Sequence, residues 1–132
     1  MATRSTIAIV DENNEGRQIY CHWDGYLEGN GKTLMKHYTT IEKINKLMDL
    51  GDLSSLGQNI DPPQGKEHSF DKKIDGVCVA YGRDRGETDI EAKKFRNEPT
   101  RSEEFDYLFK NGKWHFRNLG REFVEIKVKP KE

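Results

Sequence analysis

Apolar and polar residues alternate in short runs at the start of this chain, and turn-forming residues separate the runs. Residues 5–10 are rich in β-branched side chains, and residues 17–23 alternate again. The polar segment 11–16 contains Asn and Gly, which tolerate the positive φ of a tight turn. The pattern therefore predicts an antiparallel hairpin. In its second strand, one face carries Ile19, Cys21 and Trp23, and the other carries Tyr20 and His22.

Helical spacing replaces this alternation after residue 31. Leu34, Met35 and Tyr38 indicate a first helix, and Thr39 with Glu42 three residues later resembles a capping box that starts a second helix. Gly51 suits the position just past a helix end. We expect two helices, or one helix broken near Thr39, with the apolar face on the sheet. The apolar stripe of the second helix comprises Ile41, Ile44, Leu47 and Met48.

The middle of the chain gives weaker signals. Residues 52–73 are mostly polar and contain Pro62 and Pro63, which block regular structure. Residues 77–81 form a short apolar run that predicts a central strand. Residues 82–104 are strongly charged, and we expect one or two helical turns there, after Thr88.

The clearest local signal is Asn111-Gly112 between two alternating runs, because a type I′ turn needs positive φ at both central positions. The resulting register has an aromatic face and a face with a charge pair worth about a few tenths of a kcal/mol. It pairs Phe109 with Trp114, Tyr107 with Phe116, and Asp106 with Arg117.

Residues 123–128 predict a last edge strand with Val124, Ile126 and Val128 inward. Together these elements predict an α+β fold, with residues 1–132 as a single domain. We expect a mostly antiparallel sheet of about six strands with two short helices packed on one face.

Composition limits the classes of function. The 132 residues are 34% charged and 33% hydrophobic, which predicts a thin core. The 22 Lys and Arg nearly balance the 23 Asp and Glu, so nucleic acid is not an expected partner. No apolar run approaches the roughly 20 residues of a membrane span, and the N-terminus has no signal-peptide pattern. Cys21 and Cys78 are therefore interpreted as reduced, buried thiols of a cytoplasmic protein.

His22 and Asp24 are the candidate catalytic residues. Two positions apart in an extended chain, they share a face, so the carboxylate could orient the imidazole for acid–base chemistry or join it in binding a ligand. The alternative is structural: Asp24 begins a turn and His22 lies on the outer face of the sheet. The other histidines lack the spacing of metal ligands, so neither a metal site nor a cofactor is predicted.

Gly29-Asn30-Gly31-Lys32-Thr33 lies between a strand and a helix, which is the context of a phosphate-binding loop. Its spacing fails that motif, because Tyr26 stands where the first Gly is required. A weaker hypothesis remains, in which free amides at the helix start and the Lys32 ammonium hold an anion.

Arg83 and Arg85 follow the apolar run at 77–81 and could grip phosphate or carboxylate, although such runs are often solvated loops. With Trp23, Tyr26 and Lys32 they complete the candidate ligand-binding residues. Whether Arg83 or Arg85 faces His22 depends on a strand order that the sequence does not give.

Several segments of the chain share one further property. They are 1–8 (Met-Ala-Thr-Arg-Ser-Thr-Ile-Ala), 20–26, 31–34, 37–38, 50–57, 83–87 and the 105–114 hairpin. These segments resemble a family of small proteins recurrent in the genomes of tailed bacteriophages. The resemblance covers most of the chain, and the His-Trp-Asp-Gly-Tyr segment is its most specific part. It implies expression inside an infected bacterial cell, but it transfers no activity and no catalytic residues.

Two hypotheses follow. In the first, the protein is a non-enzymatic accessory protein of the infected cytoplasm that binds either a host or defence protein or a small anionic, nucleotide-like ligand. In the alternative, it is a small hydrolase or transferase acting on a phosphate-containing substrate. His22 would then be the acid–base group, Asp24 its orienting partner, and Lys32 with Arg83 or Arg85 the charge stabilisers.

Overall fold

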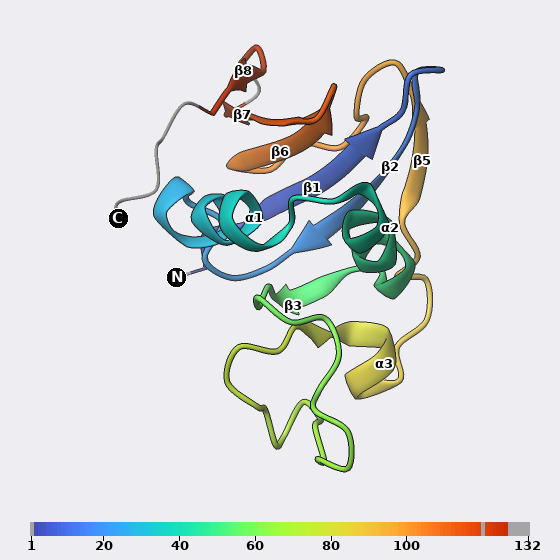
Figure 1. The fold of residues 1–132 in the computed structure, drawn as a ribbon, viewed down its shortest axis with the longest axis vertical. Helices are drawn as coiled ribbons and strands as arrows, with labels where there is room; N and C mark the ends of the chain where they lie inside the picture. Colours follow the sequence, from blue (N-terminus) through green and yellow to red (C-terminus); the bar gives the residue numbers. More distant parts are fainter. Residues whose placement is uncertain (1, 120, 127–132) are drawn as a thin grey trace.

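The computed structural model describes residues 2–119 and 121–126. Within these residues the chain forms eight strands, three α-helices and one π-helical turn around one continuous sheet (Figure 1). The strands are β1 (Ser5–Val10), β2 (Glu15–Cys21), β3 (Leu53–Ser55), β4 (Val79–Ala80), β5 (Lys93–Arg96), β6 (Phe105–Lys110), β7 (Lys113–Asn118) and β8 (Val124–Glu125). The helical segments are η1 (Leu27–Gly31, the π-helical turn), α1 (Lys32–His37), α2 (Ile41–Leu50) and α3 (Tyr81–Arg85).

The sheet is mixed rather than antiparallel. Its strands follow the order β4-β3-β2-β1-β6-β7-β8, and β5 pairs with β2 beside that path. The β1–β6 and β2–β3 pairs are parallel, and the other pairs are antiparallel. The α+β class is as predicted, and five of the seven strand pairs are antiparallel, but the sheet has eight strands rather than about six. The two parallel pairs were not predicted, because they join segments far apart in sequence.

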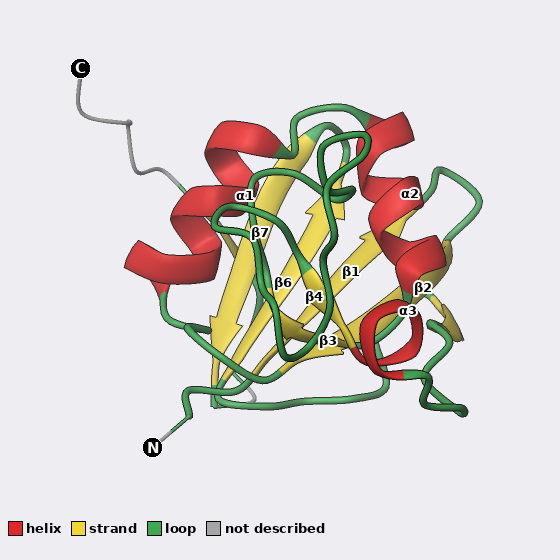
Figure 2. Ribbon diagram, turned by 90° about the horizontal axis from the view of Figure 1, so that it is seen from below, coloured by secondary structure: helices red, strands yellow, loops and turns green. Residues whose placement is uncertain are grey.

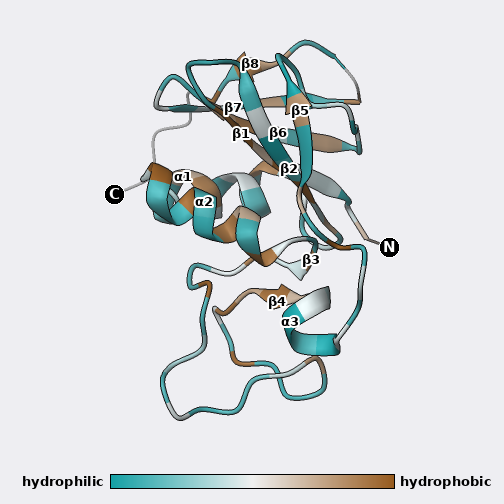
Figure 3. Ribbon diagram, turned by 90° about the vertical axis from the view of Figure 1, so that its right-hand side faces the viewer, coloured by the Kyte–Doolittle hydropathy of each residue, from teal (hydrophilic) through white to brown (hydrophobic). Residues whose placement is uncertain are grey.

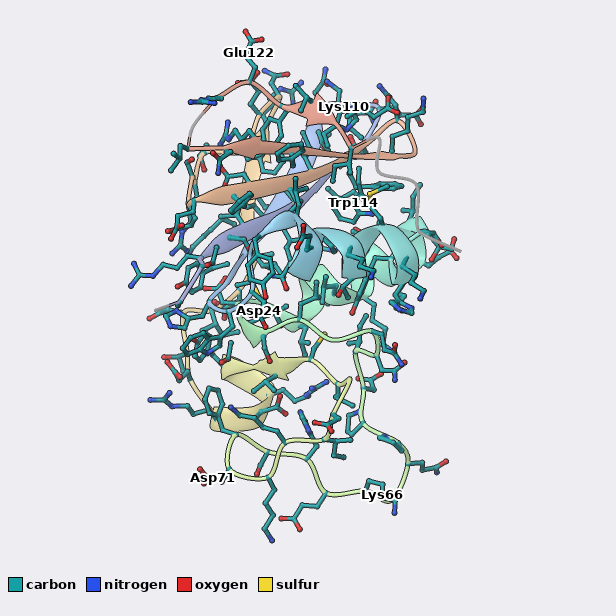
Figure 4. All side chains as sticks on the ribbon, turned by 90° about the vertical axis from the view of Figure 1, so that its left-hand side faces the viewer. Asp24, Lys66, Asp71, Lys110, Trp114 and Glu122 are labelled. Carbon is teal, nitrogen blue, oxygen red and sulfur yellow. The ribbon has the colours of Figure 1, made fainter. Side chains whose placement is uncertain are left out.

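Helices α1 and α2 cover one face of the sheet, as predicted (Figures 1 and 2). Leu34, Ile44 and Leu47 from these helices are fully buried with Ile7 and Ile19 of the sheet. Figure 3 shows α1 and α2 on one side of the sheet, with β3, β4 and α3 below them. Figure 4 places Trp114 in this interior, and its indole N–H donates to the Tyr38 carbonyl at 2.9 Å. The core therefore lies between the helices and the sheet.

Helix α2 begins one residue later than predicted. The Thr40 hydroxyl, not that of Thr39, accepts a hydrogen bond from the Lys43 amide at 3.2 Å. Gly51 follows the helix with φ 85°, as its position predicted.

The hairpin of β6 and β7 confirms the predicted register at all three pairs. Asn111 and Gly112 both have positive φ, as a type I′ turn requires. The charge pair differs from the prediction in one respect. Asp106 is fully buried, and the Arg117 side chain beside it is only 14% exposed, so this is not a surface ion pair.

The run at 77–81 yields only the short strand β4, which ends the strand order and is not central. Strand β3, within the segment expected to be loop, separates it from β2. Val77 and Cys78 are buried outside the sheet ladder, which explains why an apolar run was mistaken for a central strand.

The charged segment 82–104 also differs. Its helical turn, α3, precedes Gly86 rather than following Thr88, and residues 93–96 form β5. Phe95 alone of the four β5 residues is buried, so the sequence carries little strand signal there.

The last strand is shorter than predicted. Ile126 is buried as expected, but Val124 is 52% exposed. The prediction for Val128 lies outside the described residues.

Cys21 and Cys78 are both buried, and neither forms a disulfide bond. Burial raises the pKa of the Cys21 thiol to about 12, and it also raises the pKa of Cys78. Both side chains therefore stay protonated thiols that pack in the core and do not act as nucleophiles.

Candidate functional site

The segment after β2 leaves the sheet in a tightly fixed turn. Asp24 has φ 58°, and the Gly25 amide donates to the Thr3 carbonyl at 2.8 Å. A Cβ on Gly25 would lie 2.7 Å from that same carbonyl oxygen and 2.8 Å from the Ser5 Cβ. Only glycine allows so close an approach of the two backbones, so the sequence Asp24-Gly25 sets the path of the turn.

Buried side chains hold this turn from below. The Asn30 amide donates to the Trp23 carbonyl at 3.0 Å and to the Ser5 hydroxyl at 3.1 Å. The hydroxyl of Tyr107, on β6, donates to the Gly25 carbonyl at 2.6 Å. The turn is thus tied to β1 and β6 as well as to β2.

Trp23 and Tyr26 stand on the outside of this turn, each 43% exposed. Trp23 does not share the core face of Ile19 and Cys21, because β2 ends at Cys21. The His22 ring meets the Trp23 ring edge-on, with 4.8 Å between centroids. We call His22, Trp23 and Tyr26 the aromatic ledge.

His22 contacts Tyr20 rather than Asp24. The Tyr20 hydroxyl lies 2.7 Å from His22 Nδ1, in agreement with their predicted common face. The Asp24 carboxylate lies instead 3.4 Å from the Tyr26 hydroxyl. No hydrogen bond joins His22 to Asp24 in the described part of the chain, so the orienting contact of the enzyme hypothesis is absent there.

The charge of Asp24 acts on the ledge. It raises the pKa of Tyr26, and the Glu28 carboxylate adds to this effect. The Arg101 guanidinium lies 4.6 Å from the centre of the Tyr20 ring, and it also pairs with the Glu103 carboxylate at 3.3 Å. Charged groups of both signs therefore lie near the ledge.

The amides of the glycine segment are not free. Those of Gly29 and Gly31 donate to the Tyr26 carbonyl, that of Asn30 donates to Asp24, and that of Lys32 donates back into η1. The backbone amides that an anion would need are already hydrogen-bonded in the π-helical turn, and α1 continues directly from this turn. The predicted helix start with exposed amides does not form, although the Lys32 side chain is exposed.

Arg83 is committed to the structure around α3. It donates to the carbonyls of Ile60 and Cys78 at 2.7 and 2.8 Å and to the Asp84 carboxylate at 2.9 Å. Arg85 pairs with Glu87 at 3.2 Å. Neither arginine has a hydrogen bond or ion pair to His22 or Asp24 among the described residues.

His68 is the polar group that sequence reasoning missed. Its Nδ1 accepts from the Ile74 amide at 3.1 Å, so Nε2 carries the proton toward the Cys78 carbonyl and Asp84. The side chains of His68 and Asp84 are only 1% and 3% exposed.

Burial raises the pKa of Asp84, but hydrogen bonds from Arg83 and the Ala80 amide outweigh this effect, so the net pKa of Asp84 is lowered. This buried cluster holds the 57–76 loop, whose tip carries Lys66 in Figure 4.

Two cavities lie elsewhere on the molecule. One, of about 740 Å³, lies at the turn of the β1–β2 hairpin and includes Arg17, Ile41 and Phe109. The other, of about 460 Å³, lies between α2 and the 59–63 segment. Neither is lined by a predicted site residue.

Among the described residues, no group of three or more His, Cys, Asp or Glu side chains could hold a metal ion, and no helix is long and apolar enough to cross a membrane. No protein-family model, curated protein or solved structure matches this chain. A functional proposal for this chain therefore starts from its own geometry.

Proposed function

We propose that this protein is a non-enzymatic binding module that holds a partner protein through the aromatic ledge. The observation that carries the proposal is the exposure of Trp23 and Tyr26, at 43% each, on a backbone fixed by three strands. Large aromatic side chains on a fixed turn lose little conformational entropy when a partner covers them.

Residue type supports the same interpretation. Trp and Tyr are enriched among the few interface residues that carry most of a binding energy. The ledge combines them with His22 and with nearby charges of both signs, Asp24 beside Tyr26 and Arg101 beside Tyr20. A protein surface that is both apolar and charged is the best match to this arrangement.

The resemblance to tailed-phage proteins suggests where the protein meets its partner. The partner is then a host or defence protein, met in the cytoplasm of an infected bacterium. The nucleotide-like ligand of the sequence analysis has less support, because the amides of η1 already have partners. The enzyme alternative has less support too, because His22 bonds to Tyr20.

Affinity capture from bacterial lysate tests the proposal. The wild-type chain, a Trp23→Ala/Tyr26→Ala variant and a Val124→Ala control are compared. Val124 is 52% exposed and lies in β8, which β1, β6 and β7 separate from β2 in the sheet. We expect at least one protein to be retained by the wild type and the control, and its affinity for the double variant to fall by about a hundredfold, which is about 2.7 kcal/mol. Equal retention by all three chains contradicts the proposal.

Calorimetric titration with nucleotides and the His22→Ala variant separate the alternatives. The proposal predicts no heat of nucleotide binding, and no phosphatase or transferase turnover that depends on His22. Saturable nucleotide binding that Lys32→Ala abolishes would favour the anionic ligand instead.

A further inference from the structure

Strand β5 has an open outer edge. It pairs with one end of β2 through Glu15–Gln18, and β3 pairs with the other end of β2. Figures 1 and 3 show β5 on the outside of the sheet. Among the described residues, no strand pairs with its outer side.

The main-chain groups that face outward follow from the register. The Asn97 amide donates to the Asn14 carbonyl at 2.7 Å, just beyond the strand. Main-chain groups alternate in direction along an antiparallel strand, so Lys93 and Phe95 also face β2, whereas Lys94 and Arg96 face away. The Arg96 carbonyl accepts from the Glu98 amide at 2.9 Å. The amides of Lys94 and Arg96 and the carbonyl of Lys94 have no hydrogen-bond partner within residues 2–119 and 121–126.

Charge restricts what can pair there. Lys93, Lys94 and Arg96 are exposed, and only Phe95 is anchored, against Ala8 and its neighbours in the second apolar cluster. Arg96 makes one ion pair, with Glu15 at 3.7 Å, and both side chains are largely exposed. Such a pair is worth little, so Arg96 can exchange to another carboxylate. A second copy of this edge would bring cations against cations, which disfavours self-pairing.

The larger cavity lies beside this edge. Lys94 pairs with Arg17 in the register, and Arg17 bonds to Asp49 of α2 at 2.6 Å, so their side chains point to the helix side of the sheet. Lys94, Arg96, Arg17 and Ile41 all line the cavity of about 740 Å³. A strand added outside β5, about 4.8 Å away, would direct alternate side chains toward it.

We propose that the outer edge of β5 accepts an extended acidic segment of a partner protein as an additional strand. The main-chain groups of Lys94 and Arg96 bond to the incoming strand. Its acidic side chains meet Lys94 and Arg96 on the helix side of the sheet, beside the cavity, and the apolar side chains that alternate with them lie on the opposite face, the face of Phe95. Strand addition of this kind combines main-chain hydrogen bonds with pockets for alternate side chains. The inference concerns a different surface from the aromatic ledge and does not depend on it.

The test uses a fluorescein-labelled peptide of alternating Glu and Val, with a Gln/Val peptide and a Lys/Val peptide as controls. We expect the acidic peptide alone to bind, with an affinity that weakens as salt is raised. In amide-resolved NMR, the Lys94 and Arg96 amides should become protected from exchange when it binds. Lys94→Pro removes an outward amide while keeping the inward ladder, and it should weaken binding by about tenfold or more, about 1.4 kcal/mol.

Because a proline can disturb β5, a second variant is needed. Lys94→Glu/Arg96→Glu keeps the main chain and should reverse the preference, so that the Lys/Val peptide binds and the acidic peptide does not. Two results would each overturn the proposal. One is binding of the acidic peptide that persists in both variants, and the other is NMR spectral changes confined to residues outside β5. Absence of binding at about 1 mM peptide, a weak limit for a short segment, also overturns it.

Discussion

Asp106 organises the face of the sheet that the helices do not cover. It is fully buried and accepts hydrogen bonds from the hydroxyls of Thr6 and Ser102, the Glu103 amide and the Arg117 guanidinium, at 2.6 to 3.0 Å. Buried charge is tolerated only when it is paired and hydrogen-bonded in this way. A single carboxylate thus ties β1, β6, β7 and the 101–103 segment together.

We expect Asp106→Ala to destabilise the protein by about 3 to 5 kcal/mol, because it leaves the Arg117 charge without its partner. Urea unfolding followed by circular dichroism measures the change. The control is Glu125→Ala, which removes an exposed ion pair with Lys113 at 3.5 Å and should cost about 0.5 kcal/mol or less. Similar costs for the two variants would contradict the buried network.

Asp84 makes a prediction about pH. Its folded pKa is lowered, so the unfolded carboxyl binds a proton at higher pH than the folded one. The stability that it contributes is therefore present above the unfolded value of 3.8 and is lost as pH falls through the lower folded pKa. We expect the difference in unfolding free energy between wild type and Asp84→Asn to shrink between about pH 5 and about pH 2.5. A difference that does not change with pH would show that the Asp84 charge is not stabilised by folding.

At the scale of elements, local signals were sufficient where neighbours in sequence decide the structure. The Asn111-Gly112 turn determines the β6–β7 register. Three residues of the predicted apolar stripe, Ile44, Leu47 and Met48, are buried and pack α2 on the sheet, whereas the fourth, Ile41, is 58% exposed at the helix start. Strands β3 and β5 were missed because their partners lie far away in sequence and each contributes few buried side chains. Likewise, η1 was missed because nothing in Gly29-Asn30-Gly31 distinguishes amides bonded within a π-helical turn from free amides.

The start of α2 gives a prediction with a matched control. The Thr40 hydroxyl caps the helix, so Thr40→Ala should cost about 1 kcal/mol. The adjacent Thr39 is also exposed, but its side chain makes no hydrogen bond among the described residues, and Thr39→Ala should cost less than about 0.5 kcal/mol. Thermal unfolding of the two variants measures the difference. If Thr39→Ala is the costlier change, the cap lies at the residue that the sequence pattern first indicated.

At the scale of the whole molecule, the decisive contacts are non-local. Strand β1 lies parallel to β6, about a hundred residues later, and the Thr6–Asp106 bond spans the same separation. A single sequence contains no signal for such pairings, so it could not show which groups would meet His22. It did locate the exposed aromatic segment, whose Asp24-Gly25 turn is a local signal, and it placed Tyr20 and His22 on one face, where they form a hydrogen bond. It could not predict that Arg83 and Arg85 would lie apart from His22, because that depends on the strand order.

The two tryptophans of the chain allow a direct test of the aromatic ledge. Trp23 is 43% exposed on the ledge, and Trp114 is 5% exposed in the core. In protein labelled with 5-fluorotryptophan, each gives one fluorine NMR signal, and Trp114 serves as the internal reference. Addition of the protein captured from lysate should shift or broaden the Trp23 signal and leave the Trp114 signal unchanged. A Trp23 signal that stays unchanged at saturating partner would contradict the proposal that this protein binds through the ledge.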